Sequence, residues 1–142
     1  EAAVVFGPLS VQGEYIQAMV DGANEDYDFN GAYVYASYFL TGESRPYKGG
    51  SFSRVKPNNN FDLQGGLGAW EIAVRWSYLD LNDGGIDGGE ETNYTMGVNW
   101  YLNPALRVMV NYVYANVEDR DIEGTISDAD ISSVAGRFAI DF

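Results

Sequence analysis

The dominant pattern in this chain is a strict alternation of apolar and polar residues. It is clearest at 70–78, WEIAVRWSY, where every second position is Trp, Ile, Val or Tyr. The same period of two returns at 94–102, 106–114 and 134–142. Successive side chains of a β-strand point to opposite faces, so each segment is predicted to be a strand with one apolar and one polar face.

Three further strands are predicted nearer the start of the sequence, at about 1–6, 9–20 and 29–41. Both faces of 32–40 carry aromatic residues, and we assign one alternating set to the apolar face: Val34, Ala36, Tyr38 and Leu40. The chain is therefore predicted to be a single all-β domain over 1–142, with about seven antiparallel strands connected in sequence order.

The predicted connections alternate between short and long. Gly7-Pro8 and Asn103-Pro104 are tight turns, because proline fixes φ and cannot donate a hydrogen bond to a strand ladder. Longer polar stretches lie at 21–28, 81–91 and 117–130. Short turns at one end and long loops at the other are typical of up-and-down transmembrane β-barrels of the outer membrane. A soluble antiparallel barrel or sandwich has the same strand order and is the alternative.

Three features favour the membrane barrel. Aromatic residues lie near both ends of the apolar faces, as interfacial girdles do. The opposite faces are polar or small, whereas the interior of a soluble barrel is densely apolar. The sequence also ends on Phe142, in register with the apolar face of its strand. We interpret Phe142 as a C-terminal assembly signal for the barrel-assembly machinery.

Segment 42–67 breaks the pattern of short connections. If Phe142 ends a strand on the periplasmic side, counting back along the strands places this segment on the same side, where turns are normally short. A long irregular connection of this kind is commonly functional. Between Ser44 and Phe61 it contains four bases and no acid: Arg45, Lys48, Arg54 and Lys56. We predict that it folds into the lumen and narrows the pore; the alternative is a solvated basic periplasmic loop.

The net charge of −13 is unevenly distributed along the sequence. Fifteen of the 21 acidic residues lie in or beside the three long connections, together with one base, Arg120. Arg75, Arg107 and Arg137 instead fall on polar strand faces. A lipid-facing arginine at mid-membrane would cost about 2–4 kcal/mol, so these three are assigned to the lumen. Three acids are assigned there as well: Glu14, Glu71 and Asp141.

Seven bases are therefore candidates for lining an anion path: Arg45, Lys48, Arg54, Lys56, Arg75, Arg107 and Arg137. Basic groups in a pore lower the entry barrier for anions and raise it for cations. The alternative is that Arg75 pairs with Glu71 and Arg137 with Asp141. Such pairs would weaken the positive field without neutralising the basic segment at 44–61.

The composition argues against catalysis. The chain has no Cys and no His, which removes disulfides, thiolate ligands and the commonest general base. No catalytic constellation appears, so we predict no enzymatic activity, no cofactor and no metal site. Nucleic acid is an unsuitable partner, because binding its backbone requires a basic surface.

Two stretches stand out as motifs, ASYFLTGE at 36–43, followed by Arg45 and Tyr47, and GLGAWE at 66–71. Further matching positions are Gly7-Pro8 with Gln12 and Glu14-Tyr15, NWYLNP at 99–104, and the terminal strand ending in Phe142. Together these residues resemble the phosphate-selective porin O/P family along essentially the whole chain.

The resemblance implies a homotrimeric porin of about 16 strands per barrel in the outer membrane of a Gram-negative bacterium. Such a porin passes phosphate, polyphosphate or other small anions and contacts outer-membrane lipid and lipopolysaccharide. The resemblance also implies that 42–67 is an inward-folding periplasmic segment. Bacterial barrels have an even number of strands from about eight upward, so we expect this chain to be the C-terminal part of a longer polypeptide.

A function of a different class is also compatible with the sequence. A structural or adhesive outer-membrane barrel could use the acidic outer loops to bind divalent ions or lipopolysaccharide. An occluded lumen without ion conductance would favour that alternative.

Overall fold

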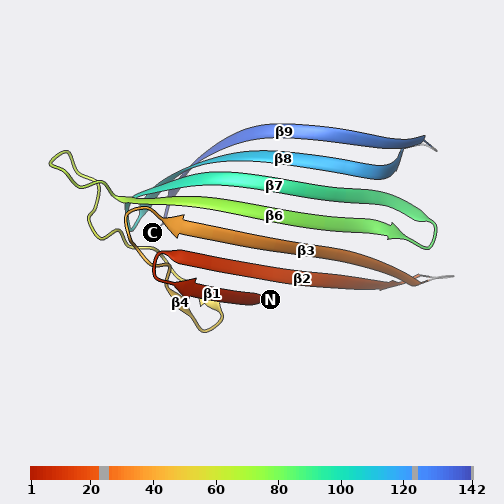
Figure 1. The fold of residues 1–142 in the computed structure, drawn as a ribbon, viewed down its shortest axis with the longest axis horizontal. Helices are drawn as coiled ribbons and strands as arrows, with labels where there is room; N and C mark the ends of the chain where they lie inside the picture. Colours follow the sequence, from red (N-terminus) through yellow and green to blue (C-terminus); the bar gives the residue numbers. More distant parts are fainter. Residues whose placement is uncertain (23–25, 123–124, 142) are drawn as a thin grey trace.

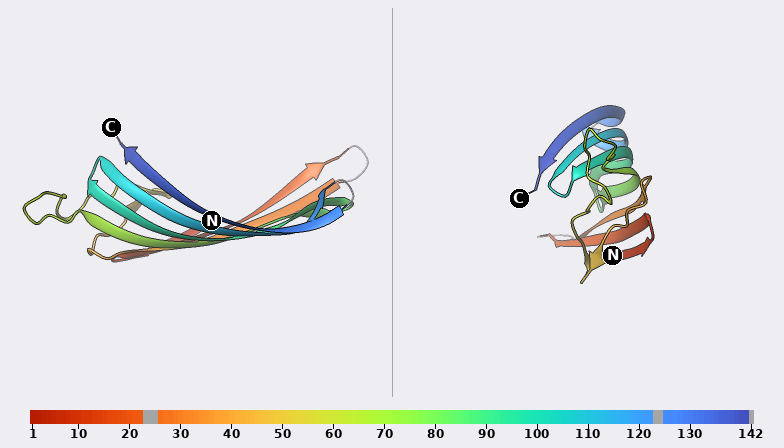
Figure 2. Two further views of the ribbon diagram at one scale, coloured as in Figure 1. Left: turned by 90° about the horizontal axis from the view of Figure 1, so that it is seen from above. Right: turned by 90° about the vertical axis from the view of Figure 1, so that its left-hand side faces the viewer.

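The computed structural model describes residues 1–22, 26–122 and 125–141, which form one curved antiparallel sheet (Figure 1 and Figure 2). Its seven strands follow sequence order: β1 (Ala2–Phe6), β2 (Leu9–Asp21), β3 (Asp26–Phe39), β6 (Ala69–Asp83), β7 (Ile86–Asn103), β8 (Leu106–Ile122) and β9 (Thr125–Ile140). A small hairpin, β4 (Tyr47–Lys48) and β5 (Ser51–Phe52), lies in the segment between β3 and β6. The predicted all-β, up-and-down antiparallel class is confirmed, and in the described residues the sheet is open, with β1 and β9 as its edges.

No helix in the described ranges is long and apolar enough to cross a membrane.

Through the middle of the sheet a continuous register places apolar and polar residues on opposite faces. Register shifts occur near strand ends, at Asp80/Asn82, Tyr101/Asn103 and Val117/Arg120. Residues directly opposed in a ladder share a face, and one such row is entirely apolar: Val4, Val11, Ala36, Val74, Met96, Tyr112 and Val134. The adjacent row, on the other face, is mostly small or polar: Val5, Ser10, Ser37, Ala73, Gly97, Asn111 and Ala135. We call these the apolar face and the polar face.

Away from Trp70 and Trp100, which residues 61–67 contact, the apolar face is not covered by any described part of the chain. Val74 is 50%, Met96 62% and Val134 74% exposed. Val34 and Tyr38 are also exposed on this face, which confirms the predicted assignment of their strand. A soluble antiparallel sheet packs its apolar face into a core, whereas the wall of a transmembrane barrel presents that face to lipid.

The connections predicted to be long loops are mostly strand. Between β6 and β7 only residues 84–85 leave the sheet, and both are glycines with positive φ, 64° and 136°. The predicted loops at 21–28 and 117–130 are likewise largely taken up by strands. These acidic stretches have a low intrinsic tendency to form strands. They do so here because a neighbouring strand offers hydrogen-bond partners, and β-propensity depends strongly on such context. The acids therefore extend along the far ends of the strands.

The opposite end of the sheet holds the short turns. Gly7 takes a positive φ of 57° in one turn, and Asn103 closes the other by accepting the N–H groups of Ala105 and Leu106 at 2.8 and 3.0 Å. The segment from β3 to β6 lies at this same end (Figure 1), as the strand count predicts. The N–H of Phe61 in this segment donates to the Leu102 carbonyl at 2.7 Å.

Adjacent residues of β7 lie on opposite faces, so a charge introduced at one should destabilise the protein far more than a charge introduced at the other. We expect Met96→Arg to lower the free energy of unfolding by about 2–4 kcal/mol, because it places a charge in lipid. Thr95→Glu, one position away on the polar face and opposed to Arg75 in the ladder, should change it by less than about 1 kcal/mol. The measurement is denaturant unfolding of the full-length protein in lipid vesicles. Equal effects of the two substitutions would contradict the assignment of the faces.

Candidate functional site

The segment between β3 and β6 is joined to the polar face by a buried ion pair. The Glu71 side chain, on β6, is fully buried, and its Oε1 pairs with Nη2 of Arg45 from the segment. Its Oε2 accepts hydrogen bonds from Nδ2 of Asn99 at 2.9 Å and from the Tyr101 hydroxyl at 3.0 Å. A buried carboxylate is tolerated only when it is paired and hydrogen-bonded, and both oxygens of Glu71 meet this condition.

Arg45 is held on its other sides by aromatic rings. Its Cζ lies 5.5 Å from the ring centroid of Phe52 and 6.0 Å from those of Tyr35 and Phe39. Burial acts to lower the pKa of Arg45, but the Glu71 carboxylate outweighs it, so the pKa is raised. Arg45 is thus a charged anchor whose positive charge is compensated by Glu71.

This pair corrects one expectation from the sequence. The alternative that Arg75 pairs with Glu71 is wrong, because the partner of Glu71 is Arg45, which lies 26 residues away in the chain. The second expected pair is wrong too, since no ion pair joins Arg137 to Asp141 in the described residues. Arg137 is opposed to Met109 in the ladder, whereas Asp141 lies beyond the last residue of β9.

A second buried carboxylate shapes the start of the segment. Glu43 is only 4% exposed, and its Oε1 accepts the N–H of Asn58 at 2.9 Å. Its Oε2 accepts a hydrogen bond from the Thr41 hydroxyl, whose oxygen in turn accepts the N–H of Trp70 at 2.9 Å. Residues 43–58 are therefore closed into a loop whose two ends are tied to each other and to β6.

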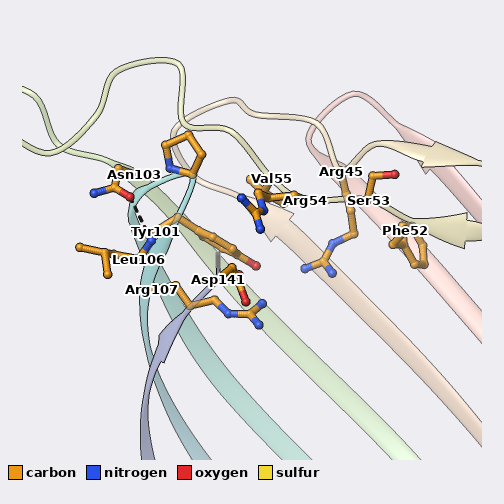
Figure 3. A pocket seen from close by; sticks show the side chains of 11 residues that line it. Arg45, Phe52, Ser53, Arg54, Val55, Tyr101, Asn103, Leu106, Arg107 and Asp141 are labelled. Atoms are coloured by element: carbon orange, nitrogen blue, oxygen red, sulfur yellow. Dashed lines mark hydrogen bonds between the residues drawn. The ribbon is translucent and has the colours of Figure 1, made fainter.

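A pocket of about 350 Å³ lies between this loop and the polar face (Figure 3). Its floor includes Tyr101, which packs with Val55 of the segment in the small buried core. Figure 3 shows the guanidinium groups of Arg45, Arg54 and Arg107 grouped around the Tyr101 hydroxyl, with Asp141 beside Arg107. Besides Arg45, which Glu71 compensates, the pocket is lined by the charged residues Arg54, Arg107 and Asp141.

Two arginines of the polar face lie over tyrosine rings. The Cζ of Arg75 lies 4.5 Å from the ring centroid of Tyr33, and that of Arg107 lies 5.8 Å from the centroid of Tyr101. A guanidinium carries five N–H donors that lie in one plane. Such a group can donate two parallel hydrogen bonds to a phosphate or carboxylate.

The remaining candidate residues are more scattered. Arg137 is exposed on the polar face, and Lys48, Arg54 and Lys56 are exposed on the segment. Glu14 is half-buried on the polar face, where it opposes Tyr33 in the ladder. Phe142 lies outside the described residues, so its role as an assembly signal stays a prediction. Likewise, no group of three or more acidic side chains in the described part of the chain is placed to hold a metal ion.

Sequence reasoning missed the residues that support these charges. Tyr33, Tyr101 and Asn99 hold the arginines and Glu71 in place, yet they carry no charge and form no motif. A usable signal was present, because each falls on the polar set of its strand. An aromatic residue that repeatedly shares a face with arginine is a candidate stacking partner.

The whole of 42–67 was predicted to fold into the lumen, but its last part, residues 61–67, does not lie on the polar face. The Phe61 ring packs edge-on against Trp100 at a centroid distance of 5.0 Å. The Leu67 carbonyl accepts the indole N–H groups of Trp70 and Trp100 at 3.2 and 2.9 Å. Both tryptophans belong to the apolar face, so residues 61–67 lie on that side. They do so because the two indoles supply apolar packing together with hydrogen-bond donors.

A largely uncovered apolar face on one side of a sheet and a polar face that bears charged residues on the other are the features of a transmembrane barrel wall. The family model for phosphate-selective porin O and P matches residues 1–142. This chain belongs to that family. Its members are porins, which are channel proteins.

Two relatives extend the comparison. Porin O of Pseudomonas aeruginosa is 34% identical over 132 residues, which cover 83% of this chain and 29% of that protein. An uncharacterized protein of Caulobacter vibrioides is 40% identical over 113 residues, which cover 79% of this chain and 23% of that protein. The chain thus spans less than a third of the length of either relative.

The Arg45–Glu71 pair generates a stability prediction. Arg45→Met leaves Glu71 buried without its partner, and losing one member of a buried pair costs about 3–5 kcal/mol. We expect residues 45–58 to detach, so that the Asn58 and Ser53 amides exchange hydrogen much faster in mass-spectrometric measurements. Lys48→Met, an exposed position in the same segment, is the matched control and should leave the exchange unchanged. Unaltered protection in Arg45→Met would show that other contacts hold the loop.

Proposed function

We propose that this protein is part of an outer-membrane porin of a Gram-negative bacterium through which small anions, such as phosphate or polyphosphate, diffuse passively. The observation that carries the proposal is the placement of Arg75, Arg107 and Arg137 on the polar face, opposite a face that is apolar and largely uncovered. Membership of the porin O/P family supports it.

The three arginines lie at successive depths along the proposed channel. Their positions can be compared on β8, which contains Arg107. Arg75 lies in the same ladder row as Val113 of β8, and Arg137 lies in the same row as Met109 of β8. At about 3.3 Å per residue, these levels span roughly 20 Å along the strand. An anion that leaves its hydration shell can therefore be passed between guanidinium groups without covalent chemistry. Multiple weak sites of this kind allow an ion both to enter and to leave.

The basic segment adds to this path at the short-turn end. Arg54 and Arg107 line the same pocket, and Lys48 and Lys56 are exposed nearby in the segment. The abundant acids lie mainly at the far ends of the strands, so they contribute to the vestibule more than to the proposed constriction. We further propose that the complete protein is a homotrimer that contacts lipopolysaccharide and is assembled through its C-terminal strand.

The proposal is tested by ion selectivity. In planar bilayers with a KCl gradient, the full-length protein is expected to give a reversal potential of the sign that indicates preference for Cl⁻. Replacing Arg75, Arg107 and Arg137 together by Gln should shift this potential towards the cation side, because it removes three positive charges from the path. Arg120→Gln, at the acidic end of β8, is a control for a change of charge outside the path and should have a much smaller effect.

Two results would count against the proposal. A wild-type channel that prefers K⁺ would contradict the assignment of the arginines to the conducting path. A folded protein without conductance would favour the structural or adhesive barrel, in which acidic outer loops bind divalent ions or lipopolysaccharide.

A further inference from the structure

Residues 61–67 form a tip that exposes large apolar side chains at the short-turn end of the sheet. Leu63 is 96%, Leu67 65% and Phe61 40% exposed. In Figure 1 the yellow-green loop that contains them extends beyond the first residue of β6, away from the acidic ends of the strands. Neither the polar face nor the basic pocket involves these three side chains.

The conformation of the tip is defined by hydrogen bonds. The Asp62 carboxylate accepts the N–H groups of Gln64 and Gly66 at 2.7 and 3.0 Å, and these bonds lower its pKa. The Asp62 N–H donates to the Gly66 carbonyl at 3.2 Å. A Cβ atom on Gly66 would lie 2.0 Å from the Asn60 carbonyl oxygen, so this position requires glycine. The turn therefore exposes Leu63, while its one acidic group, the Asp62 carboxylate, is bound by backbone N–H groups.

The tip is continuous with the apolar face. Phe61 packs on Trp100, and the Leu67 carbonyl accepts both indole N–H groups. The Trp70 and Trp100 rings stack at a centroid distance of 5.2 Å, and Phe138, 60% exposed, lies in the same ladder row as Trp100. Indole rings with one apolar body and one polar N–H favour the boundary between lipid and water. The tip extends this aromatic row past the ends of the strands.

We propose that residues 61–67 are an interfacial anchor that inserts Leu63, with Phe61 and Leu67 beside it, into the headgroup boundary of the membrane leaflet at the short-turn end. This inference rests on the proposed function, because it requires that the apolar face meets lipid. Lipid is favoured over a protein partner because the exposed side chains continue the lipid-facing row. The backbone of the tip is suited to this position, since its turn satisfies several of its own N–H groups internally.

The anchor gives the long segment two attachments on opposite sides of the wall. Arg45 ties its first part to Glu71 on the polar face, and the tip holds its last part at the membrane surface. The exposed bases Lys48, Arg54 and Lys56 lie between these attachments. A charged stretch held at both ends keeps a defined place over the polar face instead of moving into the periplasm.

The test uses fluorescence quenching in the full-length protein, reconstituted in phosphatidylcholine vesicles. This chain has no cysteine, so Leu63→Cys introduces a single site here for an environment-sensitive nitrobenzoxadiazole label. Native cysteines elsewhere in the full-length protein are replaced by serine. Quenchers are a nitroxide on the lipid headgroup, a nitroxide on the upper acyl chain, and aqueous iodide. Asn59→Cys, exposed just before the tip, is the aqueous control, and Met96→Cys is the control for the lipid-facing strand surface.

The expected result is a blue-shifted emission at position 63, strong quenching by the headgroup nitroxide, and iodide quenching several-fold weaker than at position 59. Leu67→Cys should behave like Leu63→Cys. If position 96 is quenched by lipid nitroxides while 63 is quenched by iodide alone, the anchor is overturned and the barrel proposal stands. If position 63 is shielded from all quenchers, a protein surface covers the tip and the anchor is overturned. If position 96 is also inaccessible to lipid, the proposed function itself fails.

Discussion

The structure depends on a ladder register that is continuous across the central rows of seven strands. A β-strand has a side-chain period of two, so a slip of one residue at any pair would exchange the two faces of every strand beyond it. With the observed register, Val4 to Val134 form an apolar row while the adjacent row is small or polar. The same register places Arg75, Arg107 and Arg137 on one face. The separation of lipid-compatible and ion-compatible surfaces is therefore a consequence of backbone pairing.

The second constraint is the burial of Glu71. A fully buried carboxylate needs a positive partner and further donors. Arg45 supplies the charge from the long segment, and Asn99 and Tyr101 supply the donors from β7. This arrangement is what brings the long segment onto the polar face and creates the pocket beside Arg107. It also changes the interpretation of the charges. One of the seven candidate bases serves to position the loop, and the electrostatic field of the proposed channel has to come from the others.

The long segment is divided between the two faces of the sheet. Its first part carries the bases and packs on the polar side, whereas residues 61–67 pack on tryptophans of the apolar side. This division follows the chemistry of the two parts, since the first is basic and the last is apolar and rich in glycine. Among the described residues the buried hydrophobic cluster is small and consists of Phe39, Val55, Ala69 and Tyr101. Stability in the proposed membrane setting would rest on the ladder, the buried carboxylates and the lipid.

The sequence by itself determined the strands, their faces and the end of the sheet at which 42–67 lies. These properties follow from a side-chain period of two, from the turns at Gly7-Pro8 and Asn103-Pro104, and from counting strands, since each antiparallel strand reverses the direction of the chain. All three can be read from the sequence without knowing any tertiary contact. It also assigned Arg75, Arg107 and Arg137 to the face where the structure places them. Only the tertiary structure decided the partner of Glu71, the tyrosines beneath Arg75 and Arg107, and the placement of 61–67 against Trp100. It also extended the strands through acidic stretches that had been expected to be loops. Those features depend on contacts between residues far apart in the chain, where a neighbouring strand or a buried charge outweighs local preference.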